Sequence, residues 1–256
     1  MTEDILFEVE GAIATITLNR PQKLNAVTPE MAEAIEAAIA ECNRSDTIRC
    51  VILTGAGERA FCAGSDIKEL DSYDTPWQFR NRGDYCDAVR ALSKPSIAAV
   101  NGYAFGGGLE TAMSCDIRIA SENAQFAAPE IKLGWIGGGG MAAHLQHSIG
   151  ASNAALMLMT GDPISAQQAE RWGLVSEVVE QGRLLARARE IASAIAARAP
   201  IAAETAKTNL KAAVSMPFEK AVQYERDLQT ICFATEDAAE GRAAFKEKRQ
   251  PCFKRR

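Results

Sequence analysis

Two glutamates lie beside runs of glycine, in an arrangement that could support proton-transfer chemistry. Glu110 ends the stretch GGGLE at residues 106–110, and Glu130, twenty residues later, precedes a second run at residues 137–140. Two carboxylic acids in one apolar pocket repel each other and lose solvation, which raises the pKa of one of them. Such a pair can hold a water molecule and move its proton. Taken alone, each glutamate could equally be a helix-start or loop-edge acid, and the spacing does not decide whether the two converge.

The glycines could supply hydrogen-bond donors to a substrate oxygen. A helix that opens at residues 106–108 exposes backbone N–H groups that have no acceptor inside the helix, and glycine lets a ligand oxygen approach them closely. The loop FCAGSDIKEL at residues 61–70 has a second glycine ahead of a short helix. Donors from two such loops would form an oxyanion hole for a carbonyl oxygen that becomes an enolate. The same pattern is also compatible with two ordinary loops.

Other motifs argue against nucleotide, metal and serine-hydrolase chemistry. The chain has no Gly-Lys dipeptide, hence no P-loop, and no G-x-S-x-G nucleophile motif. GAGERA at residues 55–60 fits a dinucleotide fingerprint, but the next residues predict no helix to face a pyrophosphate. His144 and His147 are the only histidines and lack the H-E-x-x-H spacing of a zinc pair, so we expect surface or core histidines.

Composition and charge are those of an ordinary globular protein. The 256 residues are 47% apolar and 24% charged. No segment approaches the roughly 18 consecutive apolar residues of a membrane span, and the acidic N-terminus MTEDILFEVE is unlike a signal or transit peptide. We therefore expect a cytoplasmic protein with no membrane partner. Its seven cysteines form no C-x-x-C pair, which favours reduced thiols.

The net charge of −5 gives no attraction to nucleic acid, except at the C-terminus. The last twelve residues, FKEKRQPCFKRR, carry six basic side chains and one acidic side chain. Such a tail is typically frayed in solvent, or it could hold a polyanionic ligand.

Strand and helix patterns alternate in the first part of the chain, and helices dominate the rest. Strands are expected at residues 5–10, 11–19, 50–57, 96–102, 116–120 and 124–128, and helices at 28–44, 76–93 and 108–115. Beyond residue 140 the pattern favours helices at 141–149, 152–159, 165–172, 182–198, 200–213, 217–232 and 236–249, with one strand at 175–179. This order predicts an α/β fold, which we divide into a core at residues 1–199 and a helical segment at 200–256.

An ordered set of motifs resembles the enoyl-CoA hydratase (crotonase) family. The motifs are FCAGSDIKEL, NGYAFGGGLETAMSCDIRIA, AQFAAPEIKLGWI, LMTGDPISAQQAERWGLVSEVV and AFKEKR, and the similarity runs from NRPQKLNA onward. The resemblance implies a crotonase-like core of repeated strand-strand-helix turns and an acyl-CoA thioester substrate. It also implies a C-terminal helical segment that builds a homotrimer or homohexamer, and no metal or cofactor beyond the coenzyme A of the substrate.

The resemblance also implies roles for individual residues. The two oxyanion N–H donors match Ser65 and Gly107, and the two hydratase glutamates match Glu110 and Glu130. With both glutamates present, the implied reaction is hydration of a 2-enoyl-CoA, in which Glu110 mainly holds and activates the water and Glu130 protonates C2. The residues expected to contact the substrate are Ala63, Ser65, Asp66, Ile67, Lys68, Gly107, Trp135, Phe245 and Lys248.

The segment after Glu130 departs from the family pattern Ile-Pro-Gly-x-Gly-Gly-Thr-Gln-Arg-Leu. It reads IGGGGMAAHL, with Gly137 in place of the proline, Met141 in place of a glycine and His144 in place of the arginine. Together with the bulky Trp135, the Gly137-Gly138-Gly139-Gly140-Met141 loop is compatible with a substrate that has a branched, cyclic or aromatic acyl group. It is also compatible with a dehydratase that works mainly in the reverse direction. The sequence is also compatible with an enoyl-CoA double-bond isomerase or related acyl-CoA enzyme, and with a non-catalytic scaffold or nucleic-acid binder that uses the basic tail.

Overall fold

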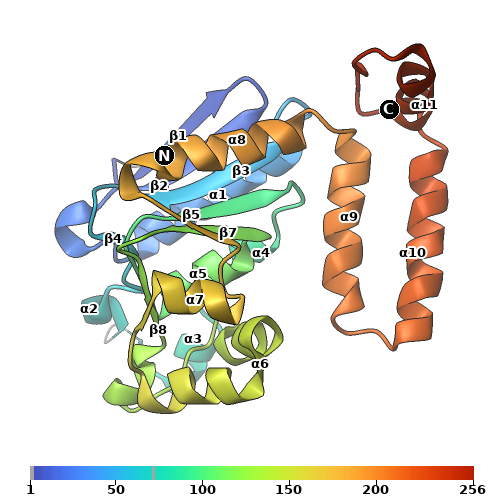
Figure 1. The fold of residues 1–256 in the computed structure, drawn as a ribbon. Helices are drawn as coiled ribbons and strands as arrows, with labels where there is room; N and C mark the ends of the chain where they lie inside the picture. Colours follow the sequence, from blue (N-terminus) through green and yellow to red (C-terminus); the bar gives the residue numbers. More distant parts are fainter. Residues whose placement is uncertain (1–2, 71–72) are drawn as a thin grey trace.

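The computed structural model describes residues 3–70 and 73–256, whose strands form two β-sheets (Figure 1). Within these residues the larger sheet has six strands, and all neighbours are parallel except the first pair. Its spatial order is β1 (Ile5–Glu10), β2 (Ile13–Leu18), β3 (Cys50–Gly55), β5 (Ser96–Val100), β7 (Ile117–Ser121) and β10 (Glu177–Val179). The smaller sheet runs in the order β4 (Ala60–Cys62), β6 (Tyr103–Phe105), β8 (Gln125–Ala127) and β9 (Ile164–Ser165).

The central strands of the larger sheet are buried throughout because helices cover both faces of that sheet. Every residue of β3 and β5 is buried, as expected for parallel strands between two helical layers. On one face Val51 and Leu53 join the core that includes α1 (Pro29–Arg44). On the other face Cys50 and Ile52 pack with α8 (Leu184–Ala196), which Figure 1 shows lying across the sheet.

The chain passes from the larger to the smaller sheet three times, and helical structure follows each passage. The successive strand pairs are β3 and β4, β5 and β6, and β7 and β8. They lead respectively into α2 (Ile67–Leu70), α5 (Gly107–Ser114) and the 3-10 helix η2 (Pro129–Leu133). This repeated strand-strand-helix path confirms the α/β crotonase-like core. It also brings the three following loops to the same end of the fold.

Two parts of the sequence-based secondary structure need correction. The predicted helix at residues 76–93 is wrong: α3 (Pro76–Arg80) ends before Gly83, and α4 (Tyr85–Arg90) begins anew because the Asp84 side chain accepts from the Cys86 N–H. The strands β4 and β6 were not predicted, since each has only three residues within a glycine-rich stretch. Because β4 begins at the last residue of GAGERA, a strand and not a helix continues from that motif.

The helical prediction beyond residue 140 is confirmed in its main features. The two helices predicted at 141–149 and 152–159 form α6 (Met141–Thr160), which bends at Gly150, where φ is 77° and ψ is 159°. It is followed by α7 (Ala166–Trp172). The residues described contain no helix with the length and apolar character needed to cross a membrane.

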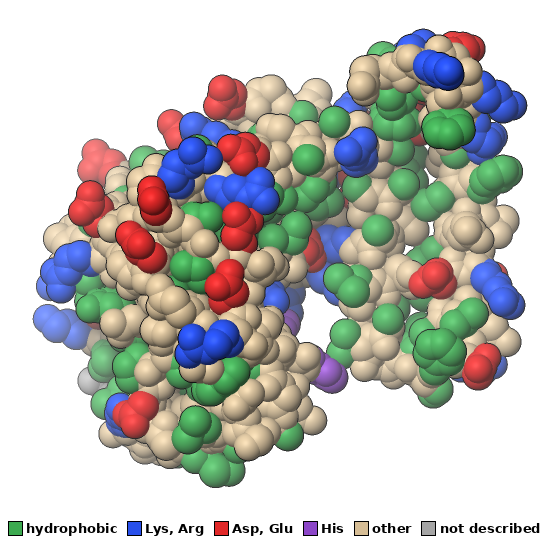
Figure 2. Space-filling view, viewed as in Figure 1, with side chains coloured by type: hydrophobic (Ala, Val, Ile, Leu, Met, Phe, Trp, Pro, Cys, Tyr) green, Lys and Arg blue, Asp and Glu red, His purple; other side chains and the backbone are tan. Residues whose placement is uncertain are grey.

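The last three helices form an arm whose first helix is joined to the body by ion pairs and whose second helix lies beyond the first (Figure 1). They are α9 (Pro200–Ala213), α10 (Phe218–Phe233) and α11 (Glu236–Glu247). Figure 2 shows hydrophobic side chains along this arm. Its exposed large apolar residues are Leu210, Val214, Phe218, Ile231, Phe233 and Phe245, at 56–86% exposure.

The basic tail docks onto α11 instead of fraying. Asp237, itself buried, accepts hydrogen bonds from the Lys254 and Arg255 N–H groups at 2.7 and 2.9 Å. Arg249 pairs with Glu240 and Glu247, and Arg255 pairs with Asp46 of the body and Glu204 of α9. Part of the positive charge of the tail is therefore neutralised within the chain.

Candidate active site

Glu130 lies against the glycines that open α5, and its charge acts on Glu110 of the same helix. Gly106 has φ 55° and ψ −127°, a backbone conformation that other residues rarely adopt. A Cβ atom built on Gly106 would lie 2.9 Å from Glu130 Oε1. The carboxylate of η2 therefore rests against the start of the helix that carries Glu110, although twenty residues separate the two acids in sequence.

Glu110 is held by the second glycine run. The side chain is 4% exposed, and its Oε1 accepts hydrogen bonds from the N–H groups of Gly139 at 2.7 Å and Met141 at 3.1 Å. A Cβ atom on Gly139 would lie 2.7 Å from Glu110 Oε2, closer than non-bonded atoms can approach. Glycine at this position thus lets the backbone contact the carboxylate directly. The run at residues 137–140, which departs from the family pattern, forms a cradle for this acid.

Glu130 presents an oxygen that has no partner. Glu130 Oε2 is buried and makes no hydrogen bond to any of the described residues. Leaving a buried charged oxygen without a donor costs on the order of 1–3 kcal/mol or more. Native proteins rarely keep such groups without a function. This oxygen is therefore the atom of the site that we regard as the first candidate for a role in its chemistry.

Burial raises the pKa of both acids. For Glu110, burial is the main cause and the nearby negative charge of Glu130 adds to it, while the N–H groups of Gly139 and Met141 act in the opposite direction on the pKa. For Glu130, burial alone accounts for the raised pKa. In the described part of the chain, neither carboxylate forms an ion pair with a lysine or arginine. Raised pKa values without a cationic partner are typical of acid–base sites.

The backbone amides of Ser65 and Gly107 come from two loops in contact. Gly64 O accepts from Val27 N–H, and Asp66 N–H donates to Val27 O. The N–H of Ser65 between them, like that of Gly107 at the first position of α5, donates to no protein acceptor in residues 3–70 and 73–256. A Cβ atom on Gly64 would lie 3.2 Å from the Gly107 nitrogen. Two free donors from separate loops therefore lie side by side.

A groove of about 550 Å³ opens beside these amides, between α1 and α4. Ser65 and Tyr85 are the residues at which this groove meets the site. Its outer walls include Thr28, Glu33, Arg82 and Ala88. Neither glutamate lines it, so it reaches the site from the amide side and not from the carboxylate side.

Most of the remaining residues predicted to bind substrate lie near the amides. Ala63 and Asp66 flank Gly64 and Ser65, and the ion pair with Arg20 at 2.9 Å lowers the pKa of Asp66. Ile67 and Lys68 are exposed at the start of α2. The N–H of Trp135 donates to Glu130 O, which places its backbone beside the acid, and its side chain is 40% exposed.

Phe245 and Lys248 are not brought to the site within one chain. Phe245 lies in α11 with 86% exposure, and Lys248 caps the end of that helix. Figure 1 shows α11 at the far end of the arm, well away from α2 and α5. Any contact of these two residues with the same ligand as Ser65 has to be made with a different copy of the chain.

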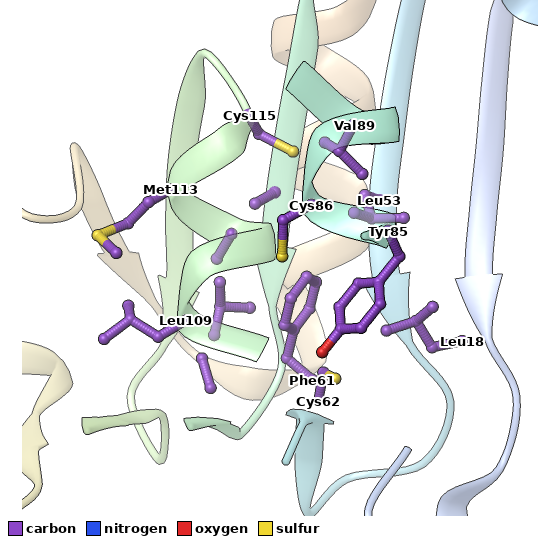
Figure 3. Close-up of a cluster of buried hydrophobic side chains, with 14 of the residues drawn as sticks. Leu18, Leu53, Phe61, Cys62, Tyr85, Cys86, Val89, Leu109, Met113 and Cys115 are labelled. Atoms are coloured by element: carbon purple, nitrogen blue, oxygen red, sulfur yellow. The ribbon is translucent and has the colours of Figure 1, made fainter. Parts of the chain in front are cut away.

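The structure adds one polar group that the sequence analysis missed. Tyr85 is 8% exposed, and its hydroxyl lies 3.2 Å from Ser65 Oγ. Figure 3 shows its ring beside Phe61, among the buried side chains of α4 and α5. The sequence assigned residues 76–93 to one helix and so gave Tyr85 no special place. The useful signal was Gly83-Asp84, a helix break and N-cap directly before it.

The two histidines lie on α6 in different surroundings. His144 is partly buried, and burial together with Arg90 lowers its pKa, whereas His147 is exposed on α6. Among the described residues, no group of three or more His, Cys, Asp or Glu side chains is arranged to hold a metal ion.

Comparisons of sequence and structure with known proteins identify one family for this chain. The model of the enoyl-CoA hydratase/isomerase family matches residues 8–256. Short-chain-enoyl-CoA hydratase of Clostridium acetobutylicum is 40% identical over 251 residues, which covers 96% of this chain and 96% of that protein. (E)-Benzylidenesuccinyl-CoA hydratase of Thauera aromatica is 38% identical, and the match covers 98% of each. The crystal structure of an enoyl-CoA hydratase from Bacillus anthracis matches with a TM-score of 0.93 at 36% identity, covering 99% of this chain and 100% of that chain.

Proposed function

The chain belongs to the enoyl-CoA hydratase/isomerase family, and from that premise we propose that it adds water across the double bond of a 2-enoyl-CoA thioester to give a 3-hydroxyacyl-CoA. One observation carries the proposal: buried Glu110 and half-buried Glu130, neither with a cationic partner, lie near the start of α5, where the amides of Ser65 and Gly107 have no acceptor among the described residues. The reaction transfers only the elements of water, so its electrons balance without a redox cofactor.

In the proposed mechanism the thioester oxygen lies between the N–H groups of Ser65 and Gly107. Attack of water at C3 moves an electron pair onto C2 and this oxygen, which becomes an enolate. Free amide donors that are already oriented stabilise this charge most as it develops, and removing one such donor typically lowers turnover by about 10²–10³-fold. The two loops fit this requirement because neither amide has an acceptor to give up within residues 3–70 and 73–256.

The two glutamates divide the proton transfers. Glu110 Oε1 already accepts two backbone N–H groups, so its Oε2 is the oxygen that holds the water and takes one of its protons as the O–C3 bond forms. Glu130 Oε2 has no partner and gives its proton to C2, which completes the addition. The raised pKa of Glu130 favours the protonated form that this step requires.

The coenzyme A part of the substrate lies, in this proposal, along the loop that includes Ala63, Asp66, Ile67 and Lys68. The exposed apolar side chains of the arm exceed the scattered pattern usual for a monomer surface. We propose that copies of this chain cover them in a homotrimer or homohexamer. Phe245 and Lys248 would then reach the coenzyme A bound by a neighbouring copy, which reconciles their predicted role with their position. Light scattering after gel filtration should give a mass near three or six times 27.5 kDa, and a monomer would contradict the arrangement.

The decisive experiment is turnover in ¹⁸O-labelled water. A panel of 2-enoyl-CoA thioesters with short, branched and aromatic acyl groups is assayed by loss of the conjugated absorbance, and the products are analysed by mass spectrometry. The hydratase incorporates one labelled oxygen into a 3-hydroxyacyl-CoA. A double-bond isomerase would move the double bond without taking up the label, and that result would exclude hydration as the main activity.

A further inference from the structure

Tyr85 and Ser65 form a hydroxyl pair between the two free amides. Tyr85 Oη lies 3.2 Å from Ser65 Oγ, within hydrogen-bond distance. A Cβ atom on Gly107 would lie 2.1 Å from Tyr85 Oη, so the hydroxyl lies directly against the backbone of Gly107. The phenol thus contacts both residues whose amides are proposed to receive the thioester oxygen.

One hydroxyl hydrogen of the Tyr85–Ser65 pair is not used in the hydrogen bond between the two side chains. Two hydroxyls carry two hydrogens, and a single bond between them occupies one of those hydrogens. Apart from Ser65 Oγ, no acceptor for Tyr85 Oη is present among the described residues. Since the groove also reaches the site at Ser65 and Tyr85, the remaining hydrogen is available to a ligand that enters there.

The phenol is the better donor of the two, and it stays protonated. A phenol has a pKa near 10 and donates more strongly than an aliphatic alcohol. Burial, the main cause, raises the pKa of Tyr85 well above its usual value, so the hydroxyl keeps its proton throughout the working range of an enzyme. This favours Ser65 Oγ as the donor to Tyr85 Oη, with the phenol hydrogen free for the ligand.

We propose that the Tyr85 hydroxyl donates a third hydrogen bond to the thioester oxygen, beside the amides of Ser65 and Gly107, and that the Ser65 side chain is a positioning group that orients it. This rests on the proposed function. It also explains why Gly107 has to be glycine, since a side chain there would displace the phenol.

The first test is kinetic. Tyr85→Phe keeps the ring in the core and removes only the hydroxyl, and a hydrogen bond to a developing charge contributes about tenfold to hundredfold in rate. We expect kcat to fall by that factor with KM nearly unchanged, because the bond strengthens mainly in the transition state. Ser65→Ala, which retains the amide, should cost less, and the double variant should be no slower than Tyr85→Phe. Tyr103→Phe removes a hydroxyl without a protein partner in the described residues and serves as the matched control.

The second test does not depend on hydration. Acetoacetyl-CoA can bind as an enolate, whose near-ultraviolet absorbance reports its formation on the protein. We expect Tyr85→Phe to raise the enolisation pKa of bound acetoacetyl-CoA, so that enolate formation falls about tenfold to hundredfold. Glu130→Gln should abolish hydration and still bind the enolate, which separates failure of the proposed function from failure of this inference. Tyr85→Phe with kcat and enolate formation both within about twofold of the parent would overturn the third hydrogen bond.

Discussion

Two groups of charged side chains in the interior of this protein differ in whether each charge has an oppositely charged partner. At the base of the arm, Lys207 Nζ lies 2.8 Å from Asp116 Oδ2, and Lys94 Nζ lies 2.9 Å from Glu204 Oε1. Arg255 pairs with the other oxygen of Glu204 at 2.8 Å. Each buried charge there has an opposite charge in contact. In the site, Glu110 and Glu130 have no such partner.

The difference distinguishes charged side chains that stabilise the fold from acidic side chains that can transfer protons. A buried ion pair keeps both groups charged because each stabilises the other, and its role here is to fix α9 to the body. A buried acid without a cation is held close to the protonated form, where it can exchange a proton at modest cost. Burial of a charge alone therefore does not identify a functional group, whereas burial without compensation does.

The largest effect is expected from breaking the ion-pair cluster. Lys207→Met removes the buried cation and leaves the partly buried Asp116 with Ser96 as its partner among the described residues, and removing one member of a buried pair typically destabilises a protein by about 3–5 kcal/mol. Urea unfolding should show this loss. Lys220→Met, an exposed lysine of α10 whose hydrogen bond in the described residues is to Gln223 of the same helix, is the control and should change stability little. A stable Lys207→Met protein would mean that the cluster does not anchor the arm.

Neutralising the site acids should have the opposite effect, because turnover should fall while stability is kept. Glu110→Gln and Glu130→Gln each remove an essential proton-transfer group and should lower kcat at least about a hundredfold, with little change in acyl-CoA affinity. Thermal stability should be unchanged or improved, because an uncompensated buried charge is removed. Steady-state kinetics and thermal melts on the same preparations check both. Near-normal turnover in both variants would exclude the two-acid mechanism.

The pH dependence of stability should differ in sign between a site acid and a paired acid. Because the pKa of Glu130 is raised in the folded state, the folded protein binds more protons than the unfolded chain above about pH 4.5, and stability is lost as pH rises through the folded pKa. Relative to the parent, Glu130→Gln should gain stability over that window. Glu240, whose pKa Arg249 lowers to about 2, contributes stability above pH 4.5 that is lost as pH falls. Glu240→Gln should therefore lose stability relative to the parent as pH rises, and equal slopes for the two variants would contradict this assignment.

A smaller effect is expected from a residue that acts through the glycine cradle. Arg90 donates to Gly139 O and pairs with Asp87, and the N–H of the same Gly139 donates to Glu110. Arg90→Met should let the cradle shift and lower kcat several-fold, less than the roughly tenfold or greater loss from removing a direct donor. Arg44→Met, an exposed arginine of α1 that pairs only with Glu41, is the matched control. Identical kinetics for the two variants would show that the cradle holds Glu110 without Arg90.

The sequence predicted the parts of the site that local patterns encode. Gly106 and Gly107 at a helix start, and an acid in the first turn of that helix, are local features that could be recognised without a fold. Tyr85 could not be found in this way, because its importance depends on contacts with Ser65 and Gly107, which are twenty or more residues away in sequence. Its helix was also assigned incorrectly, since the break at Gly83 is a weak signal beside the helical pattern around it.

By itself, the amino-acid sequence determined the fold class, the helical C-terminal part and the family, because periodicity and motif order are properties of the chain alone. Only the tertiary structure decided that Glu130 contacts the glycines before Glu110, that the second glycine run cradles Glu110, and that Phe245 and Lys248 lie far from both. The physical reason is that solvation, pKa and hydrogen-bond satisfaction depend on which groups approach in space. In this fold, the chain segments that pass between the two sheets bring those groups together.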